Sequence, residues 1–184
     1  MPFKQQLIGM MMIEPAPHEL SRTAFIASFG GIYEHSPWVA ETLYDQGLNK
    51  DDGNPTKLAE RMAAIVNAAG NERQMELLCA HPELAGKLAI SKSLTAESAA
   101  EQASAQLDQC SAGEFAEFQS LNQRYHETFG HPFIIAVRGL DRAKILAAFR
   151  KRVNHSPHIE FRTALAEVHK IAKLRLDQLA TSPD

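Results

Sequence analysis

Residues 111–129 read SAGEFAEFQSLNQRYHETF, and this stretch decides the fold class. Ser111 followed by Glu114 is the pattern of a capping box, in which two side chains satisfy backbone N–H groups at a helix N-terminus. Behind the box, apolar residues recur at helical spacing, at Phe115, Phe118, Leu121, Tyr125 and Phe129. The stretch therefore predicts a long amphipathic helix with one buried face.

Similar signals for the start of a helix recur along the chain. A capping residue precedes a proline at Ser36-Pro37, Asn54-Pro55 and Ser156-Pro157, and such pairs open helices. The helices predicted from these pairs run to Gly47, to about Gly70 and to about Leu179; a further helix starts at Asn71 and stops before Pro82, and Thr95 caps another through about Leu107. Only Phe133–Val137 reads as extended, and one such run cannot form a sheet. The sequence predicts an all-α, single-domain bundle of about eight helices with one short extended segment.

Composition excludes several classes of protein. The chain has 184 residues, is 45% hydrophobic and carries a net charge of -3, which suits one domain with a substantial core and argues against nucleic-acid binding. The tightest basic cluster, Arg150-Lys151-Arg152, is expected to favour a helix C-terminus. Two cysteines without a CxxC motif suit a reduced, cytoplasmic protein. Residues 1–13 are expected to be a flexible N-terminal extension whose apolar run is too short to span a membrane, leaving 14–184 as the single domain.

His81-Pro82 places an imidazole where a helix has to stop. The residue before a proline is pushed out of the α region, so we expect His81 at a helix terminus with its side chain oriented by the break. A histidine held in this way can give or take a proton near neutral pH. The alternative is a surface or capping histidine without chemistry.

Two further stretches are candidates for ligand contact. In Ser98-Ala-Ala-Glu-Gln102, a hydroxyl, a carboxylate and an amide lie on neighbouring faces of one helix, with small alanines between them. A solvated polar face is the alternative interpretation. Phe133–Val137 has no polar side chain, and its backbone N–H and C=O groups need partners. A flat ligand rich in amide groups could pair with this backbone; the alternative is a buried connector.

Metal and nucleophile chemistry are less well supported. The chain has eight histidines but no HExxH motif, and the pairs His126/His131 and His155/His158 lie beside prolines or caps that disturb a one-face metal site. No metal is therefore predicted. Cys79 lies two residues before His81, but free cysteines are more often buried core residues, and we expect that here.

These features together resemble one family, the OHCU decarboxylases, which act on 2-oxo-4-hydroxy-4-carboxy-5-ureidoimidazoline (OHCU) in urate breakdown. The matching elements occur in the family's order over roughly residues 20 to 180 and are Gly31–Glu41, His81–Lys87, Ser98–Gln102, Leu121–Tyr125, Phe129–Gly139 and Ile171–Leu176. The departures are Glu83, where the family often has Asp, and His131, where a hydrophobic residue is common.

The resemblance implies an all-helical homodimer that needs no cofactor and converts OHCU to (S)-allantoin. It makes His81 the acid–base residue and gives Glu101 and Arg175 catalytic supporting roles, although a helical arginine such as Arg175 could simply favour the helix dipole. The implied substrate pocket is formed by Pro82, Ser98, Ala99, Ala100, Glu101, Gln102, Phe133, Ile134, Ile135, Ala136 and Val137. Two rival functions remain open: a non-catalytic helical interaction module, and a metal-dependent helical hydrolase.

Overall fold

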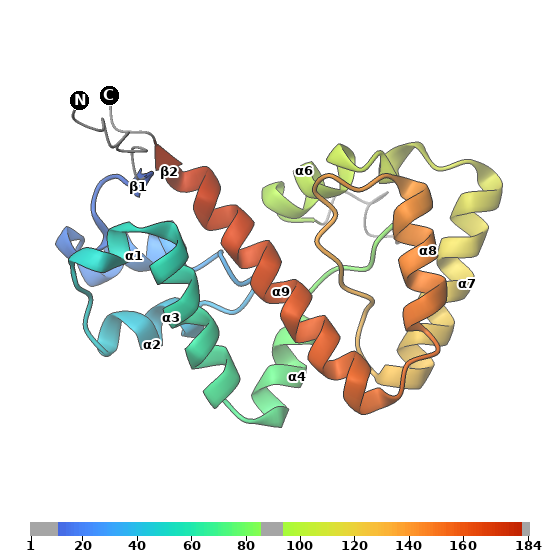
Figure 1. Cartoon of the computed structure of the whole chain (residues 1–184), viewed down its shortest axis with the longest axis horizontal. Helices are drawn as coiled ribbons and strands as arrows, with labels where there is room; N and C mark the ends of the chain where they lie inside the picture. The colour runs from blue at the N-terminus through green and yellow to red at the C-terminus, as the bar shows by residue number, and fades with distance from the viewer. Residues whose placement is uncertain (1–10, 86–93, 182–184) are drawn as a thin grey trace, which may run out of the picture. The chain divides into compact units, whose positions relative to one another are not determined.

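The computed structural model describes residues 11–85 and 94–181. Within these ranges the chain forms eight α-helices and only two-residue strands, which confirms the all-α class (Figure 1). None of the helices in the described ranges is long and apolar enough to cross a membrane. The chain divides into two compact units, one made of Met1–Gly70 with Ala172–Asp184, the other of Asn71–Ile171.

The first unit contains three complete helices and a small antiparallel pairing. Its elements are β1 (Met12–Ile13), the 3-10 turn η1 (Pro17–Glu19), α1 (Arg22–Phe29), α2 (Trp38–Asp45), the 3-10 turn η2 (Lys50–Gly53), α3 (Pro55–Ala68), the end of α9 and β2 (Ala180–Thr181). Met12 lies opposite Thr181, and Ile13 lies opposite Ala180. The last two residues of the predicted N-terminal extension take part in this pairing, and Ile13 is buried. Residues 1–10 lie outside the described residues.

The second unit contains α4 (Asn71–Cys79), α6 (Ala96–Ser104), the 3-10 turn η3 (Leu107–Gln109), α7 (Ala112–Phe129), α8 (Arg142–Arg152) and the larger part of α9 (Pro157–Leu179). The predicted capping box is confirmed, since the Ser111 hydroxyl accepts from Glu114 N–H at 3.2 Å and the Glu114 carboxylate accepts from Ser111 N–H at 2.8 Å. Thr95 caps α6 as predicted. This helix ends at Ser104 rather than Leu107, because Gln106 takes a left-handed conformation with φ 57°.

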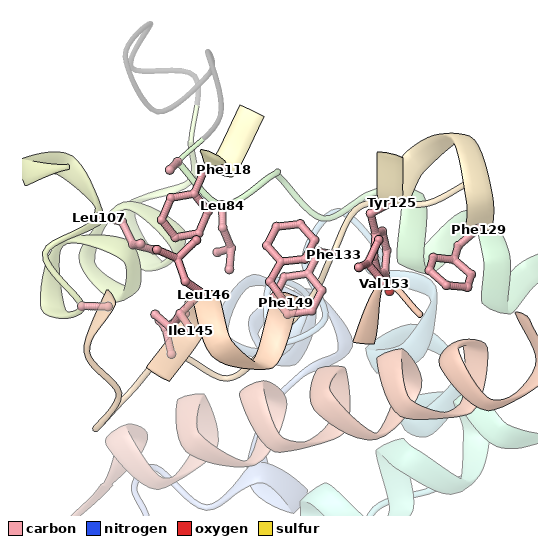
Figure 2. Packing of buried hydrophobic residues seen from close by; sticks show 13 residues of the cluster. Leu84, Leu107, Phe118, Tyr125, Phe129, Phe133, Ile145, Leu146, Phe149 and Val153 are labelled. Atoms are coloured by element: carbon pink, nitrogen blue, oxygen red, sulfur yellow. The ribbon is translucent and has the colours of Figure 1, made fainter. Parts of the chain in front are cut away.

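An aromatic cluster forms the core of the second unit (Figure 2). The ring of Phe133 stacks on Phe149 with the centroids 3.9 Å apart, and Tyr125 meets both rings edge-on at 5.4 and 5.7 Å. Such pairs add specific geometry to the burial of large apolar surfaces. The predicted extended run thus starts from a phenylalanine fixed in the core, and Val137 at its other end is buried as well.

His131 belongs to the same aromatic packing. Its ring is 1% exposed and lies edge-on to Tyr125, while Nδ1 is 2.9 Å from the carbonyl oxygen of Pro132. Because a carbonyl only accepts, Nδ1 carries the hydrogen of the neutral ring. The packing explains how a histidine fills a position at which the resemblance leads us to expect a hydrophobic residue.

Acid is expected to destabilise the protein partly through His131. Burial lowers the pKa of His131 below its ordinary value of 6.5, so the unfolded chain binds this proton first. The stability that the protein gains from keeping the His131 ring neutral is fully present above pH 6.5. This stability is lost as the pH falls below that value. Chemical unfolding followed by circular dichroism should show a weaker loss of stability between neutral and acidic pH in His131→Phe than in the wild type. The exposed His126→Gln is the control; an unchanged pH dependence in His131→Phe would contradict the expectation.

Candidate active site

His81 lies where the sequence predicts it, just beyond the end of α4. The helix ends at Cys79, and the His81 side chain is 8% exposed. Its Nδ1 atom lies 3.0 Å from the carbonyl oxygen of Leu77, one helical turn earlier. Since that oxygen only accepts, Nδ1 carries the hydrogen in the neutral ring and Nε2 is the basic nitrogen. The helix end therefore fixes both the orientation and the tautomer of the imidazole.

The backbone after Pro82 is held by side-chain amides from two helices. Gln102 of α6 donates to the Glu83 carbonyl at 3.2 Å and accepts from Ala85 N–H at 3.2 Å. Asn122 of α7 donates to the Leu84 carbonyl at 3.0 Å, and Gln119 donates to the Ala85 carbonyl at 2.9 Å. We call these three side chains the amide clamp. Gly86 and Lys87, which end the predicted His81–Lys87 motif, lie outside the described residues.

The structure brings the predicted Ser98–Gln102 stretch together with the His81 segment through Gln102. Ser98 and Gln102 are buried, Glu101 is partly buried, and Ala99 and Ala100 are exposed. Ser98 N–H donates to the Thr95 hydroxyl, which places Ser98 in the first turn of α6. The alternative of a purely solvated face is wrong for Ser98 and Gln102, because both side chains are covered by protein.

Two backbone groups of Phe133–Val137 already have partners. The Ile134 carbonyl accepts from Arg152 at 2.7 Å, and the Ala136 N–H donates to Glu167 at 2.8 Å. The Ile134 carbonyl and the Ala136 N–H are therefore already satisfied by side chains of this protein, which leaves fewer backbone groups of the run for the predicted ligand contact.

A buried charge cluster supports this run, and the sequence analysis missed it. The Glu160 carboxylate, fully buried, accepts from Tyr125 at 2.5 Å and from Arg152 Nε at 2.9 Å, and lies 2.8 Å from His155 Nδ1. The guanidinium of Arg152 also lies over the Phe133 ring, 4.4 Å from its centroid. Burial raises the pKa of Tyr125 far above its ordinary value, and the bond to Glu160 adds to this. Arg152 therefore ends α8 as predicted, but its side chain is turned into the core.

The sequence pattern of α9 could have predicted that Glu160 and Arg175 are buried. Positions four apart on this helix are all buried, and they are Glu160, Ala164, Val168, Ala172 and Leu176. A carboxylate in line with an apolar stripe must find a buried partner. Arg175, which borders the same stripe, is also buried. Nothing local, however, identifies the partner of either residue.

Arg175 belongs to the first unit, whereas the other proposed catalytic residues belong to the second. Its guanidinium contacts Glu34 at 3.2 Å and the Gly31 carbonyl at 3.3 Å. Arg175 and Glu34 are 4% and 2% exposed. The stretch Gly31–Glu41 thus supplies Arg175 with a buried carboxylate. A catalytic role for Arg175 stays a prediction.

The other candidate chemistries gain little from the structure. Cys79 is exposed rather than buried, because it lies at the end of α4 with its thiol donating to the Gly130 carbonyl at 3.4 Å. Partial desolvation raises the pKa of this thiol, which disfavours the thiolate that a nucleophile needs. Among residues 11–85 and 94–181, no three His, Cys, Asp or Glu side chains gather as a metal site would require.

Comparisons with known proteins identify the family of this chain. The sequence model for the family described as OHCU decarboxylase matches residues 18–177. A 2-oxo-4-hydroxy-4-carboxy-5-ureidoimidazoline decarboxylase of Haloferax volcanii is 43% identical over 165 residues, which is 90% of this chain and 94% of the relative. The protein of the same name from Halalkalicoccus jeotgali is 40% identical, with 91% of each chain covered.

A solved structure agrees in fold as well as in sequence. It is described as a crystal structure of (S)-allantoin synthase, and it is 36% identical with a TM-score of 0.68. The match covers 89% of this chain and 52% of that one, so the present chain spans about half of its length. The family match and both relatives extend over nearly the whole sequence. The chain therefore belongs to the OHCU decarboxylase family.

Proposed function

We propose that this protein decarboxylates OHCU to (S)-allantoin in urate breakdown, without a cofactor and with His81 as the acid–base residue. Family membership supports the reaction, and the observation that carries the role of His81 is its buried imidazole, held through Nδ1 by the Leu77 carbonyl. A general acid or base needs a fixed ring and a defined tautomer, and this arrangement supplies both.

For this reaction the protein has to orient the substrate and to control the transfer of one proton. The bond between the substrate's ring carbon and its carboxylate breaks, carbon dioxide leaves, and the electron pair passes into the substrate's conjugated C=N unit. His81 takes or gives a proton at the substrate's hydroxyl or ring as the carboxylate leaves. Protonation of the intermediate on one face then gives (S)-allantoin.

The remaining pocket residues are assigned supporting roles in the same proposal. Glu101 assists proton transfer by His81, and Arg175 binds or orients an anionic group of the substrate. Pro82, the Ser98–Gln102 stretch and the backbone of Phe133–Val137 line the pocket. Ile135 is the best candidate for pairing with the ligand, because the neighbouring Ile134 carbonyl and Ala136 N–H are bound by Arg152 and Glu167.

The function is tested with freshly prepared OHCU and the formation of chiral allantoin followed by circular dichroism. We expect a large excess of the (S) enantiomer, because the spontaneous reaction in water gives a racemate. Glu101→Gln, close in size to the native residue, should slow the reaction if the negative charge assists His81. Racemic allantoin formed at the spontaneous rate, with the protein folded, would contradict the proposal. Activity that disappears with a chelator would favour the metal-dependent hydrolase instead.

The proposal extends to the state of the protein in the cell. We propose a cytoplasmic homodimer with residues 14–184 as one decarboxylase domain. Sedimentation equilibrium over a range of protein concentrations tests the assembly. A mass equal to that of one chain at all concentrations would contradict the homodimer.

A further inference from the structure

Within the described part of the chain, the segment after His81 makes none of the backbone–backbone hydrogen bonds that a helix would give it. Pro82 has no N–H and ends the helical path, so the polar groups of Glu83, Leu84 and Ala85 must be satisfied in other ways. The amide clamp supplies four hydrogen bonds to these three residues. Three consecutive carbonyl oxygens, those of residues 83 to 85, are each held by a different side chain.

Ala85 shows how closely this segment is determined. Its φ is 48°, in the left-handed region that a residue with a Cβ atom seldom adopts. Its N–H is bound by Gln102 and its carbonyl by Gln119. A sparsely populated backbone conformation persists only where the surroundings impose it. Side chains from α6 and α7 therefore hold the main chain in a conformation that local sequence does not favour.

Two members of the clamp come from one face of α7. Gln119 and Asn122 are three residues apart, and Asn122 is 4% exposed in line with the core residues Phe118 and Tyr125. The Oδ1 atom of Asn122 is buried and has no hydrogen-bond partner in the described part of the chain. A buried amide oxygen without a partner costs free energy. The contact that it makes is the bond to the Leu84 carbonyl.

We propose that Asn122 and Gln119 are positioning residues for the decarboxylation. They anchor the segment after His81-Pro82 to α7, while Gln102 anchors it to α6, so the imidazole keeps a fixed placement relative to the Ser98–Gln102 helix. The inference rests on the proposed role of His81. Loosening the anchor misplaces the proton-transferring nitrogen and lets the intermediate be protonated on either face.

The test compares Asn122→Leu and Gln119→Met with Gln123→Met. Each variant replaces an amide by an apolar side chain of similar size, and Gln123 lies on the same helix but is exposed and bonded to Glu127. We expect Asn122→Leu and Gln119→Met to lower kcat about tenfold or more with a smaller change in KM. We expect Gln123→Met to behave like the wild type.

Enantiomeric excess separates positioning from a merely structural role. Each variant is assayed at enough enzyme to exceed the spontaneous reaction, and the uncatalysed rate is subtracted. Partial unfolding would leave fewer active molecules, each giving the same (S) excess as the wild type. A misplaced imidazole lowers that excess even in the folded molecules. Gln119 is only partly buried, so Gln119→Met tests the proposal even if Asn122→Leu does not fold.

The outcomes also separate this inference from the role of His81. If His81→Gln is inactive while Asn122→Leu and Gln119→Met match Gln123→Met in kcat and enantiomeric excess, only the positioning role is wrong. A fall in kcat that follows the melting temperature, with the (S) excess unchanged, also overturns it. If His81→Gln keeps the wild-type rate, the role of His81 is wrong, and the positioning role with it.

Discussion

Replacing His81 by glutamine is expected to lower kcat by about 10²- to 10⁴-fold, the usual contribution of a well-placed general acid or base. Glutamine can donate to the Leu77 carbonyl, as the imidazole does at 3.0 Å, but it cannot exchange a proton near neutral pH. The fold should therefore survive while proton transfer is lost. The measurement is the initial rate of (S)-allantoin formation from fresh OHCU, together with the melting temperature.

His158→Gln provides the matched control for this substitution. His158 is exposed in the first turn of α9, so the same chemical change there should leave the rate unaltered. The assignment of His81 is wrong if the folded His81→Gln protein releases carbon dioxide as fast as the wild type. A melting temperature far below that of His158→Gln would mean that the variant has lost its fold, and His81→Asn would then be assayed in its place.

The largest loss of stability is expected from Glu160→Ala. This carboxylate is fully buried and receives hydrogen bonds from Tyr125 and Arg152. Removing one partner of a buried ion pair leaves the other charge uncompensated and costs about 3–5 kcal/mol of unfolding free energy. Arg152 would be the stranded charge, and it also holds the Ile134 carbonyl. Urea unfolding followed by circular dichroism measures the difference.

The exposed pair Arg150–Glu117 is the natural comparison. Arg150 of α8 makes a bidentate contact with Glu117 of α7, which is the geometry of a strong ion pair. Both side chains, however, are accessible to solvent. Exposed pairs contribute little, so Glu117→Ala should change stability far less than Glu160→Ala. The double variant Arg152→Met with Glu160→Leu should regain part of the loss, because no unpaired charge remains. If Glu160→Ala and Glu117→Ala lowered the free energy of unfolding equally, the expectation that the buried pair contributes more to stability would be wrong.

Local signals predicted the starts of α3 and α7 well. Ser111 with Glu114 and Asn54 before Pro55 make their capping bonds within four residues, so the sequence pattern contains everything that the bond requires. The stop at His81-Pro82 was predictable for the same reason, since a proline restricts its neighbour directly. The length of α6 was not, because the turn at Gln106 depends on packing beyond the helix.

The partners of the buried polar groups could not be predicted from sequence. Asn122 reaches Leu84 across 38 positions, and Tyr125 reaches Glu160 across 35. Periodicity places Asn122 and Glu160 on buried faces, but it does not say which helix faces them. The run Phe133–Val137 was recognised by composition, yet the bonds from Arg152 to the Ile134 carbonyl and from the Ala136 N–H to Glu167 follow only from the tertiary fold.

The hydrogen bond between His81 Nδ1 and the Leu77 carbonyl limits the routes by which a proton can enter or leave the ring. A main-chain carbonyl does not ionise, so no proton can leave the ring on that side. An imidazole that relays a proton to solvent accepts it at one ring nitrogen and releases it from the other. In His81 only Nε2 can exchange a proton, so no such relay through the ring is possible. In the proposed reaction, Nε2 therefore both accepts the proton from the substrate and donates it back.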